Sequence, residues 1–208
     1  MKKILIPLFS LFLLSSPSVF ADDISDFSIE GISIGDSLLD YMTEDEILEE
    51  VEKNIDRYPY LKEPYKYVQI NLGGEFQTYD FLSFIIKNNS TNAYVGNKNE
   101  KFIIELIRGG INFDEDFDNC ILKRDELEKI LSGMFPNEPK EEYNFAHHAD
   151  PSGNSFIDGI DFTFDSGAEI DIYCSNHEET FRLKKNWREG LDVAISSADS
   201  ALWLQDYK

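Results

Sequence analysis

The residues best suited to metal chemistry form an acidic run between Asp114 and Asp125. Ca²⁺ prefers six or more oxygen ligands, and an EF-hand loop supplies them from positions 1, 3, 5 and 12, with a backbone carbonyl at position 7. Asp114, Asp116, Asp118 and Asp125 occupy those four side-chain positions, and the aliphatic Ile121 stands at position 8. The spacing predicts a weak candidate calcium site.

Two features of this run count against calcium. Position 6 of such a loop is Gly, and Asn119 is only the next-best residue for a left-handed backbone. The aspartate at position 12 also has a shorter side chain than the usual glutamate. The alternative is that these acids precede a helix from Asp125 to Phe135 and satisfy its free N–H groups and its dipole. The sequence favours this alternative.

Two adjacent histidines, His147 and His148, lie close to Asp150, while His177 stands alone. A zinc site needs three or four ligands with defined spacing, which this group does not supply. The segment 138–155 is polar and contains two prolines and a glycine, so we expect a long loop with solvated histidines or a His–Asp hydrogen bond. A small exported hydrolase that uses His148 and nearby carboxylates is therefore the alternative function.

The sequence has none of the common catalytic signatures: no G-x-S-x-G elbow, no H-E-x-x-H, no C-x-x-C and no phosphate-binding glycine loop. Its 40 acidic residues make carboxylate pairs frequent by chance, so acid–base catalysis cannot be inferred from them. We expect a non-catalytic binding or accessory protein of unknown ligand, with no cofactor apart from the calcium hypothesis. A calcium-stabilised structural module is the third hypothesis.

The first 21 residues have the order of a secretory signal. Lys2 and Lys3 are followed by an apolar stretch over residues 4–14, and then by the small or compact Val19 and Ala21. This order predicts a cleavable signal peptide. An apolar stretch of that length is too short to span a bilayer, which needs about 20 residues. We expect a periplasmic or extracellular protein without membrane insertion after cleavage.

Charge restricts the partners of the exported chain. The formal net charge is −21, and loss of Lys2 and Lys3 with the signal makes it −23. Nucleic acids and anionic lipids bind through cationic side chains, so this charge argues against both classes of partner. Mutual repulsion also favours a monomer.

The chain has two cysteines, Cys120 and Cys174. An even number of cysteines in an exported chain indicates a disulfide. Ile170, Ile172 and Cys174 alternate with polar residues, so a strand here directs Cys174 inward. We therefore expect a Cys120–Cys174 bridge.

The elements that position these residues follow from capping and apolar patterns. Thr43 and Glu46 have the capping-box spacing of a helix that runs to about Asn54. Two alternating runs around the turn at residues 165–168 predict a hairpin, and Gly109 and Gly110 suggest a bulge or a bend. Further strands are expected at residues 65–72, 79–86, 102–113 and 191–195, and a closing helix at 197–205. This order predicts an α+β fold with a mainly antiparallel sheet and two to three packing helices, arranged as two helix-plus-three-strand halves in one domain over residues 22–208.

Four groups of residues resemble a known family. They are the opening motif EGxSIGDS (Glu30–Ser37), the cysteine pair, His148-x-Asp150-x-Ser152-Gly153, and the run from Trp187 to Leu191-x-Val193. Over nearly the whole exported chain they resemble a family of small exported proteins from marine alphaproteobacteria. The resemblance implies an exported fold and no particular activity. The acidic run is not part of the family pattern, so a site there would be peculiar to this chain.

Overall fold

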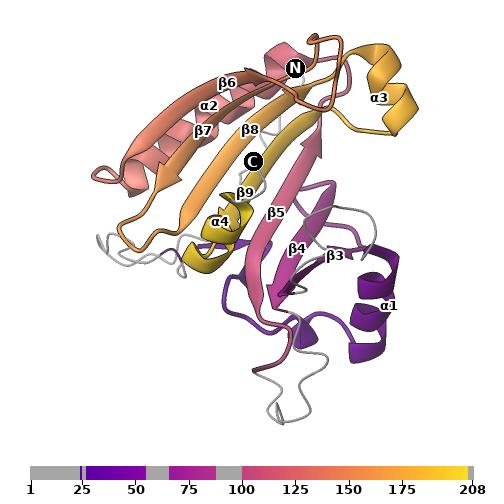
Figure 1. The fold of residues 1–208 in the computed structure, drawn as a ribbon. Coiled ribbons are helices and arrows are strands. Elements are labelled where there is room, and N and C mark those ends of the chain that lie inside the picture. Colours follow the sequence, from indigo (N-terminus) through magenta and orange to yellow (C-terminus); the bar gives the residue numbers. More distant parts are fainter. Residues whose placement is uncertain (1–23, 25–26, 55–65, 88–99, 206–208) are drawn as a thin grey trace, which may run out of the picture.

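An antiparallel sheet of seven strands forms the frame of the protein. The computed structural model describes residue 24 and residues 27–54, 66–87 and 100–205. The strand order is β3-β4-β5-β9-β8-β7-β6, and every neighbouring pair is antiparallel (Figure 1). The strands are β3 (Tyr67–Leu72), β4 (Phe81–Lys87), β5 (Ile104–Asn112), β6 (Lys140–Ala146), β7 (Phe156–Thr163), β8 (Glu169–Asn176) and β9 (Gly190–Ser196). The predicted α+β class with a mainly antiparallel sheet is confirmed.

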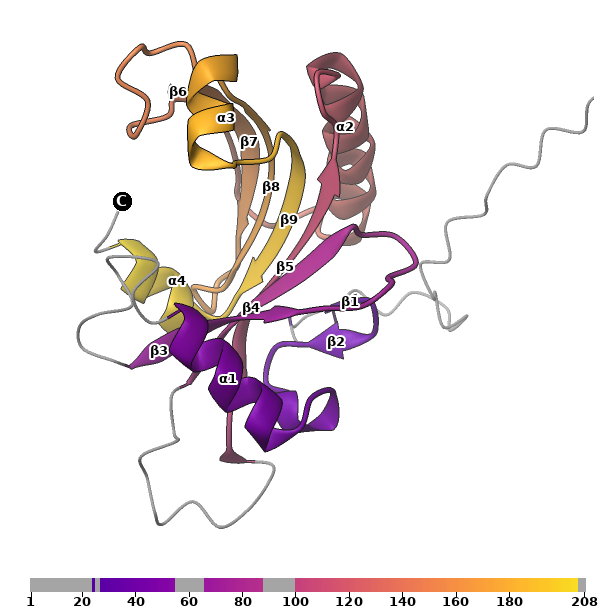
Figure 2. The ribbon, with the colours of Figure 1, turned by 90° about the vertical axis from the view of Figure 1, so that its right-hand side faces the viewer.

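Helices and a small hairpin pack against this sheet. The described residues form four α-helices, rather than the two to three expected: α1 (Glu44–Asn54), α2 (Phe117–Met134), α3 (Glu179–Lys185) and α4 (Ala198–Gln205). A hairpin of β1 (Ser28–Ile29) and β2 (Ile32–Ser33) leads into the short 3-10 helix η2 (Leu38–Asp40). Figure 2 shows the sheet as strongly curved, with α2 and the hairpin on one side and α4 on the other. None of the described helices is long and apolar enough to cross a membrane.

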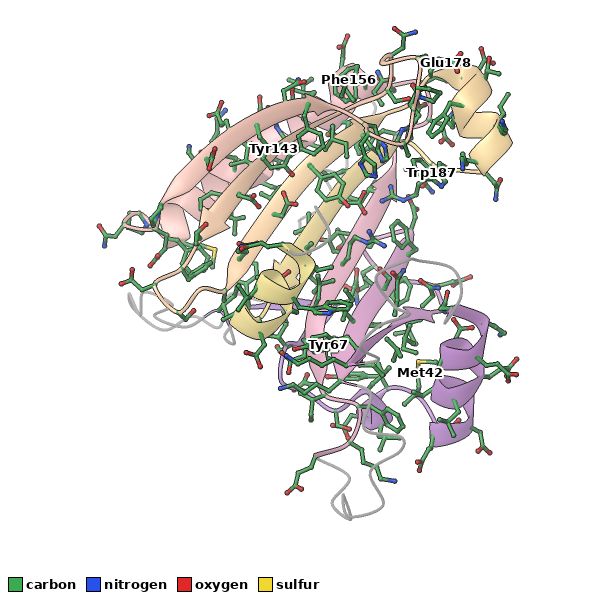
Figure 3. The ribbon with its side chains drawn as sticks, in the orientation of Figure 1. Met42, Tyr67, Tyr143, Phe156, Glu178 and Trp187 are labelled. Carbon is green, nitrogen blue, oxygen red and sulfur yellow. A yellow bond between two sulfur atoms is a disulfide. The ribbon has the colours of Figure 1, made fainter. Side chains whose placement is uncertain are left out.

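The main core lies between the sheet and α2, α1 and the hairpin. Alternate residues of each strand point to the same face of a sheet. In β8 the inward residues Ile170, Ile172 and Cys174 are fully buried, as the sequence pattern predicts. On the opposite face, Trp203 of α4 covers a smaller apolar cluster that includes Tyr67, whose ring centroid lies 4.7 Å from that of Trp203 (Figure 3).

Two local predictions are confirmed by their hydrogen bonds. The backbone N–H of Thr43 donates to Oε2 of Glu46 at 2.9 Å, and the N–H of Glu46 donates to Oγ1 of Thr43 at 3.3 Å. This reciprocal capping box starts α1. The hairpin around residues 165–168 is formed by β7 and β8, which pair from Phe156↔Asn176 to Thr163↔Glu169.

The predicted start of the second helix at Asp125 is wrong, because α2 begins at Phe117. Asp116 is its N-cap, and its side chain accepts the backbone N–H of Asn119. Asp118 lies in the first turn, where a negative charge stabilises the helix dipole. The acidic residues that resemble a loop therefore form the beginning of the helix.

The predicted long loop at 138–155 is wrong over residues 140–146, which form β6, and confirmed over residues 147–155. This strand is an edge of the sheet, and all its residues except the half-buried Tyr143 are exposed. A strand exposed on both faces has no alternation of apolar residues, which removes the usual sequence signal.

Of the bulge or bend predicted at Gly109 and Gly110, the bulge is not present at these residues, which stay in register with β4. The register shift in this pair of strands falls between Ile85 and Ile86. Gly110 stays in register opposite Phe81, and a Cβ atom at Gly110 would lie 1.9 Å from Cε1 of Phe81. The two glycines therefore provide space for aromatic rings.

Two helix-plus-three-strand halves are present, but the second half contains different strands from those expected. Helix α1 precedes β3–β5, and α2 precedes β6–β8. The last strand, β9, belongs to neither half, because it lies between β5 and β8 at the centre of the sheet. The predicted signal peptide, residues 1–21, lies outside the described residues.

Candidate functional site

A cavity of about 230 Å³ lies at the end of the sheet where β5 and β8 finish and β9 begins. Its lining comes from two stretches of the chain that are distant in sequence. One is the start of α2, with Phe113, Glu115, Phe117 and Cys120. The other runs from the end of β8 through α3 to the start of β9, with Ser175, Asn176, His177, Glu179, Arg182, Glu189 and Gly190.

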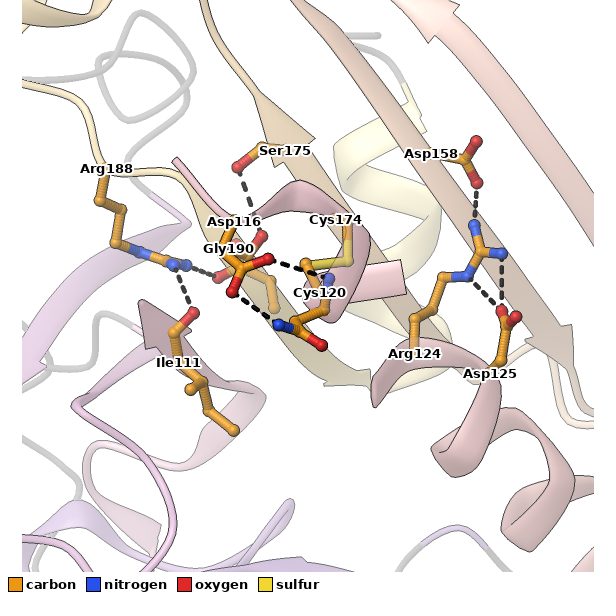
Figure 4. The surroundings of a disulfide bond; sticks show 12 residues. Ile111, Asp116, Cys120, Arg124, Asp125, Asp158, Cys174, Ser175, Arg188 and Gly190 are labelled. Carbon is orange, nitrogen blue, oxygen red and sulfur yellow. Dashed lines mark hydrogen bonds and ion pairs between the residues drawn. A yellow bond between two sulfur atoms is a disulfide. The ribbon is translucent and has the colours of Figure 1, made fainter. Parts of the chain in front are cut away.

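The start of α2 is fixed by a cap and by the disulfide. Cys120, in the first turn of α2, is bonded to Cys174 of β8, with 6.0 Å between their Cα atoms (Figure 4). The expected bridge is confirmed. The side chain of Asp116 also accepts Nδ2 of Asn119 at 2.6 Å. This wall of the cavity is therefore tied to the strand beneath it.

Helix α3 forms the opposite wall. The backbone N–H of Phe181 donates to Oε2 of its N-cap, Glu178, at 2.7 Å, and Asn186 ends the helix in a left-handed conformation. The N–H of Glu178 donates to Oγ of Ser155 at 2.8 Å, which attaches α3 to the approach to β7. Figure 3 shows Glu178 and Trp187 at this end of the molecule.

Glu189 joins the walls to one another. It is buried, and it accepts the backbone N–H of His177 at 2.8 Å and that of Glu115 at 3.4 Å. Nε of Arg182 lies 3.7 Å from Oε2 of Glu189, and its Nη2 lies 3.8 Å from Oε1 of Glu115. One carboxylate therefore links the end of β8, the approach to α2 and α3.

The segment that carries Glu189 is held by its neighbours. Arg188 lies over the ring of Phe81 at 4.2 Å and forms an ion pair with Asp192. It also donates to the backbone oxygen of Ile111 at 3.5 Å (Figure 4). Gly190 has a φ of +151°, and a Cβ atom there would lie 2.1 Å from that same oxygen. Only glycine fits at this close approach.

His177 is the most unusual polar residue of the lining. Its side chain is 8% exposed, and its ring packs near those of His147 and Trp187, with centroids at 5.5 and 5.3 Å. Its Nδ1 has no hydrogen-bond partner in the part of the chain that the structure describes. Burial, together with the charge of His147, lowers the pKa of His177, so its neutral form is favoured.

The four candidate calcium ligands do not surround one point. Asp116 caps α2, Asp118 lies in its first turn, and Asp125 lies about 10 Å further along the helix axis. Asp125 also accepts Nη2 of Arg124 at 2.7 Å. Asp114 precedes the helix and is exposed. Asp116 therefore acts as the alternative interpretation of the acidic run predicts: its carboxylate satisfies a free N–H group at the start of a helix.

Among the described residues, no three His, Cys, Asp or Glu side chains are grouped so that they could hold a metal ion. The structure places the hydrolase candidate His148 in an exposed position, with its ring stacked on that of His147 at 5.1 Å. Asp150 is buried and accepts hydrogen bonds from Ser152 and Ser155 at 2.6–3.0 Å. These bonds, chiefly that from the Ser155 hydroxyl, hold the pKa of Asp150 well below its usual range. The side chain of Asp150 therefore stabilises the loop that precedes β7 through these hydrogen bonds.

A second, more open hollow of about 590 Å³ lies beside η2 and the start of α1. Its charged groups already have partners. Glu46 forms the capping box with Thr43, and Lys101 Nζ donates to Oε1 of Glu44 at 3.1 Å. We therefore take the first cavity as the candidate site.

Sequence reasoning missed most of this site. Arg182 lies on α3, a short polar helix that was not predicted, and Glu189 is one of many acids. The predicted disulfide was the available signal, since it brings the residues around Cys120 next to those that follow Cys174. A search for charged and imidazole groups on either side of the bridge could have found Glu115 and His177.

Comparison with known proteins assigns no family to this arrangement: no protein-family model matches the chain, and neither does any curated protein or solved structure.

Proposed function

We propose that this chain is an exported, non-catalytic binding protein whose ligand site is the cavity at the end of the sheet. The observation that carries the proposal is a preformed space whose walls are fixed to one another by the disulfide and by Glu189. A rigid site avoids the cost of ordering its walls when the ligand binds. Its lining combines aromatic rings with a few polar groups, as small-molecule sites do.

Export is supported by two independent features. The first 21 residues have the order of a signal peptide. The Cys120–Cys174 bridge is typical of chains that mature in an oxidising compartment. N-terminal sequencing of the protein recovered from the periplasm or the medium is expected to start at Asp22. Recovery of the chain in the cytoplasm with Met1 intact would remove this part of the proposal.

The polar groups of the lining support binding rather than nucleophilic catalysis. A nucleophilic serine needs a base within hydrogen-bond reach. The hydroxyl of Ser175 donates to the backbone oxygen of Gly190 at 3.5 Å, and Nδ1 of the nearby His177 has no partner. The hydroxyl and the imidazole are therefore not arranged as nucleophile and base.

The proposal is tested with a cavity-blocking variant. Asn176→Trp places an indole at the half-buried end of β8, within the lining, and Asn154→Trp places the same group on an exposed loop outside it. Circular dichroism and the melting temperature of the free variants establish that both fold.

A library of small polar organic compounds is then screened by thermal shift and by ligand-observed NMR. A ligand at 100 times its Kd stabilises by about 2.7 kcal/mol, which raises the melting temperature by about 5 to 10 °C for a chain of this length. Compounds that stabilise the wild type and Asn154→Trp, and not Asn176→Trp, support the proposal. Equal stabilisation of both variants, or no binding compound in the library, overturns it.

A further inference from the structure

The charge and shape of the cavity point to a ligand class, and we propose that it takes a small organic cation, an ammonium or guanidinium compound. This inference rests on the proposed function, and its experiment separates the two.

The charged groups of the lining are mainly acidic. Glu115, Glu179 and Glu189 contribute three carboxylates, and Arg182 contributes one guanidinium. His177 adds no charge near neutral pH, because burial favours its neutral form. The lining therefore carries an excess of two negative charges. The net charge of −21 over the whole chain adds a long-range attraction for cations.

Two helices start at the cavity, and a free helix N-terminus would instead attract an anion. Both N-termini are already occupied by carboxylates of the chain itself. Asp116 accepts the N–H of Asn119 in α2, and Glu178 accepts the N–H of Phe181 in α3. The N–H donors of Phe181 and Thr180 hold the pKa of Glu178 below its usual value, so this cap stays ionised. These caps place a negative charge at each helix N-terminus and so weaken its attraction for an anionic ligand.

Arg182 does not neutralise the site. Its distances of 3.8 Å to Glu115 and 3.7 Å to Glu189 exceed those of direct charge-assisted hydrogen bonds, which are about 2.7–2.9 Å. The side chain of Glu115 is 81% exposed. Its carboxylate can therefore rotate toward a second cation without leaving a buried charge unpaired.

The unpartnered nitrogen of His177 is not a contact for this ligand. Its Nδ1 is buried from the space of the cavity, so a bound molecule does not reach it. His177 contributes to the inference only through its charge, because a neutral imidazole does not repel a cation.

The remaining lining fits the apolar part of such a molecule. Phe113 and Phe117 are half-buried and belong to the lining. Their rings can cover alkyl groups, and an aromatic face attracts a cation directly. The volume of about 230 Å³ is below the roughly 300 Å³ at which sites for drug-sized ligands begin, so the ligand is smaller than these.

The experiment compares three probes that have similar shapes and different charges: choline, the neutral 3,3-dimethylbutan-1-ol, and the anionic 3,3-dimethylbutanoate. Putrescine serves as a second cation. Binding to the purified protein is measured by calorimetry at low ionic strength. We expect both cations to bind, the neutral probe to bind at least tenfold more weakly than choline, and the anion not to bind. Added salt should weaken the cations.

Two exposed carboxylates of the lining are then neutralised singly, as Glu115→Gln and Glu179→Gln. The control is Glu141→Gln, an exposed carboxylate of β6 outside the cavity. Each exposed charge contributes little, so we expect each cavity variant to lose about two- to fivefold in cation affinity. The control should keep the wild-type affinity. Equal losses in all three variants would show general attraction by the acidic surface and overturn the inference.

The two proposals fail separately. Neutral or anionic compounds that bind the cavity as tightly as the cations, and that Asn176→Trp rejects, overturn the ligand class and leave the binding site intact. Cationic hits that Asn176→Trp rejects support both. If no compound of any charge binds, the cavity is not a ligand site and both proposals fall.

Discussion

Removal of the disulfide tests how strongly the structure depends on the link between α2 and β8. The perturbation is the pair of substitutions Cys120→Ala and Cys174→Ala, at two positions that are fully buried. The bridge joins residues separated by 54 positions. Closing a loop of about 55 residues in the unfolded chain costs an entropy equivalent to about 4 kcal/mol at 25 °C, and the variant loses this contribution. For a chain of this length the melting temperature should fall by about 8–16 °C.

The assay is urea unfolding followed by circular dichroism, with the oxidised wild type and the variant in parallel. The wild type unfolded and measured in a reducing agent provides a control, because its unfolded state also lacks the bridge. Both should lose a similar free energy of unfolding. The unfolded chain without the bridge is more expanded, so the dependence of that free energy on urea should increase slightly.

A loss below about 1 kcal/mol would refute the reasoning, because loop closure would then not be the main contribution of the bridge. A loss only in the variant, and not in the reduced wild type, would assign the effect to the packing of the two sulfur atoms.

Four further substitutions have outcomes that follow from the structure. Gly190→Ala places a Cβ atom 2.1 Å from the backbone oxygen of Ile111 at a φ of +151°, so urea unfolding should show a loss of about 2 kcal/mol or more. Gly133→Ala lies in α2 with open space around the added atom, so it should raise the free energy of unfolding by about 0.5–1 kcal/mol. If Gly190→Ala proved more stable than Gly133→Ala, the backbone geometry at these two positions would be contradicted. The folded-state pKa of Asp150 is depressed, so the ionised carboxylate stabilises the protein, and Asp150→Asn removes that stabilisation. The loss in the free energy of unfolding should be largest above the unfolded carboxyl pKa of about 4 and should shrink as the pH falls below it. A loss that stays constant down to pH 2 would contradict this. The folded-state pKa of His177 is also lowered, so protonation favours unfolding and stability should decrease as the pH falls below about 6.5; His177→Leu should show a smaller decrease between pH 7.5 and 5.5 when unfolding is measured at both values.

The elements that were predicted correctly have signals that local physics produces. The capping box of Thr43 and Glu46 determines the start of α1 by hydrogen bonds between neighbouring residues. The strands β7 and β8 each bury one face, so their apolar residues alternate. Cys174 follows the same alternation, which made the disulfide predictable from the strand and the cysteine count.

The elements that were missed lack such a signal for physical reasons. Strand β6 is an exposed edge, and α3 is a seven-residue helix with only Phe181 buried. Neither has an apolar face long enough to give a period. The start of α2 is acidic because charges there stabilise the helix, and the same composition is typical of loops.

The candidate site could not be predicted as a whole because its geometry depends on tertiary structure. Residues near 113–120, 175–182 and 189–190 meet only after the strand order is known. His177 was noticed as a lone histidine, and nothing in its sequence neighbourhood indicates that its Nδ1 is buried without a partner. The pattern around His148 and Asp150 proved to be loop structure.

The position of β9 has a consequence for how the chain folds. β9 follows β3 to β8 in the sequence, and it pairs with β5 on one side and β8 on the other. Until residues 190–196 emerge, the two halves of the sheet are separate ribbons, each with an unpaired inner edge that can pair with another chain. A nascent polypeptide truncated before Gly190 is therefore expected to aggregate, and completion of the central strand is expected to be the step that commits the whole sheet to its native topology.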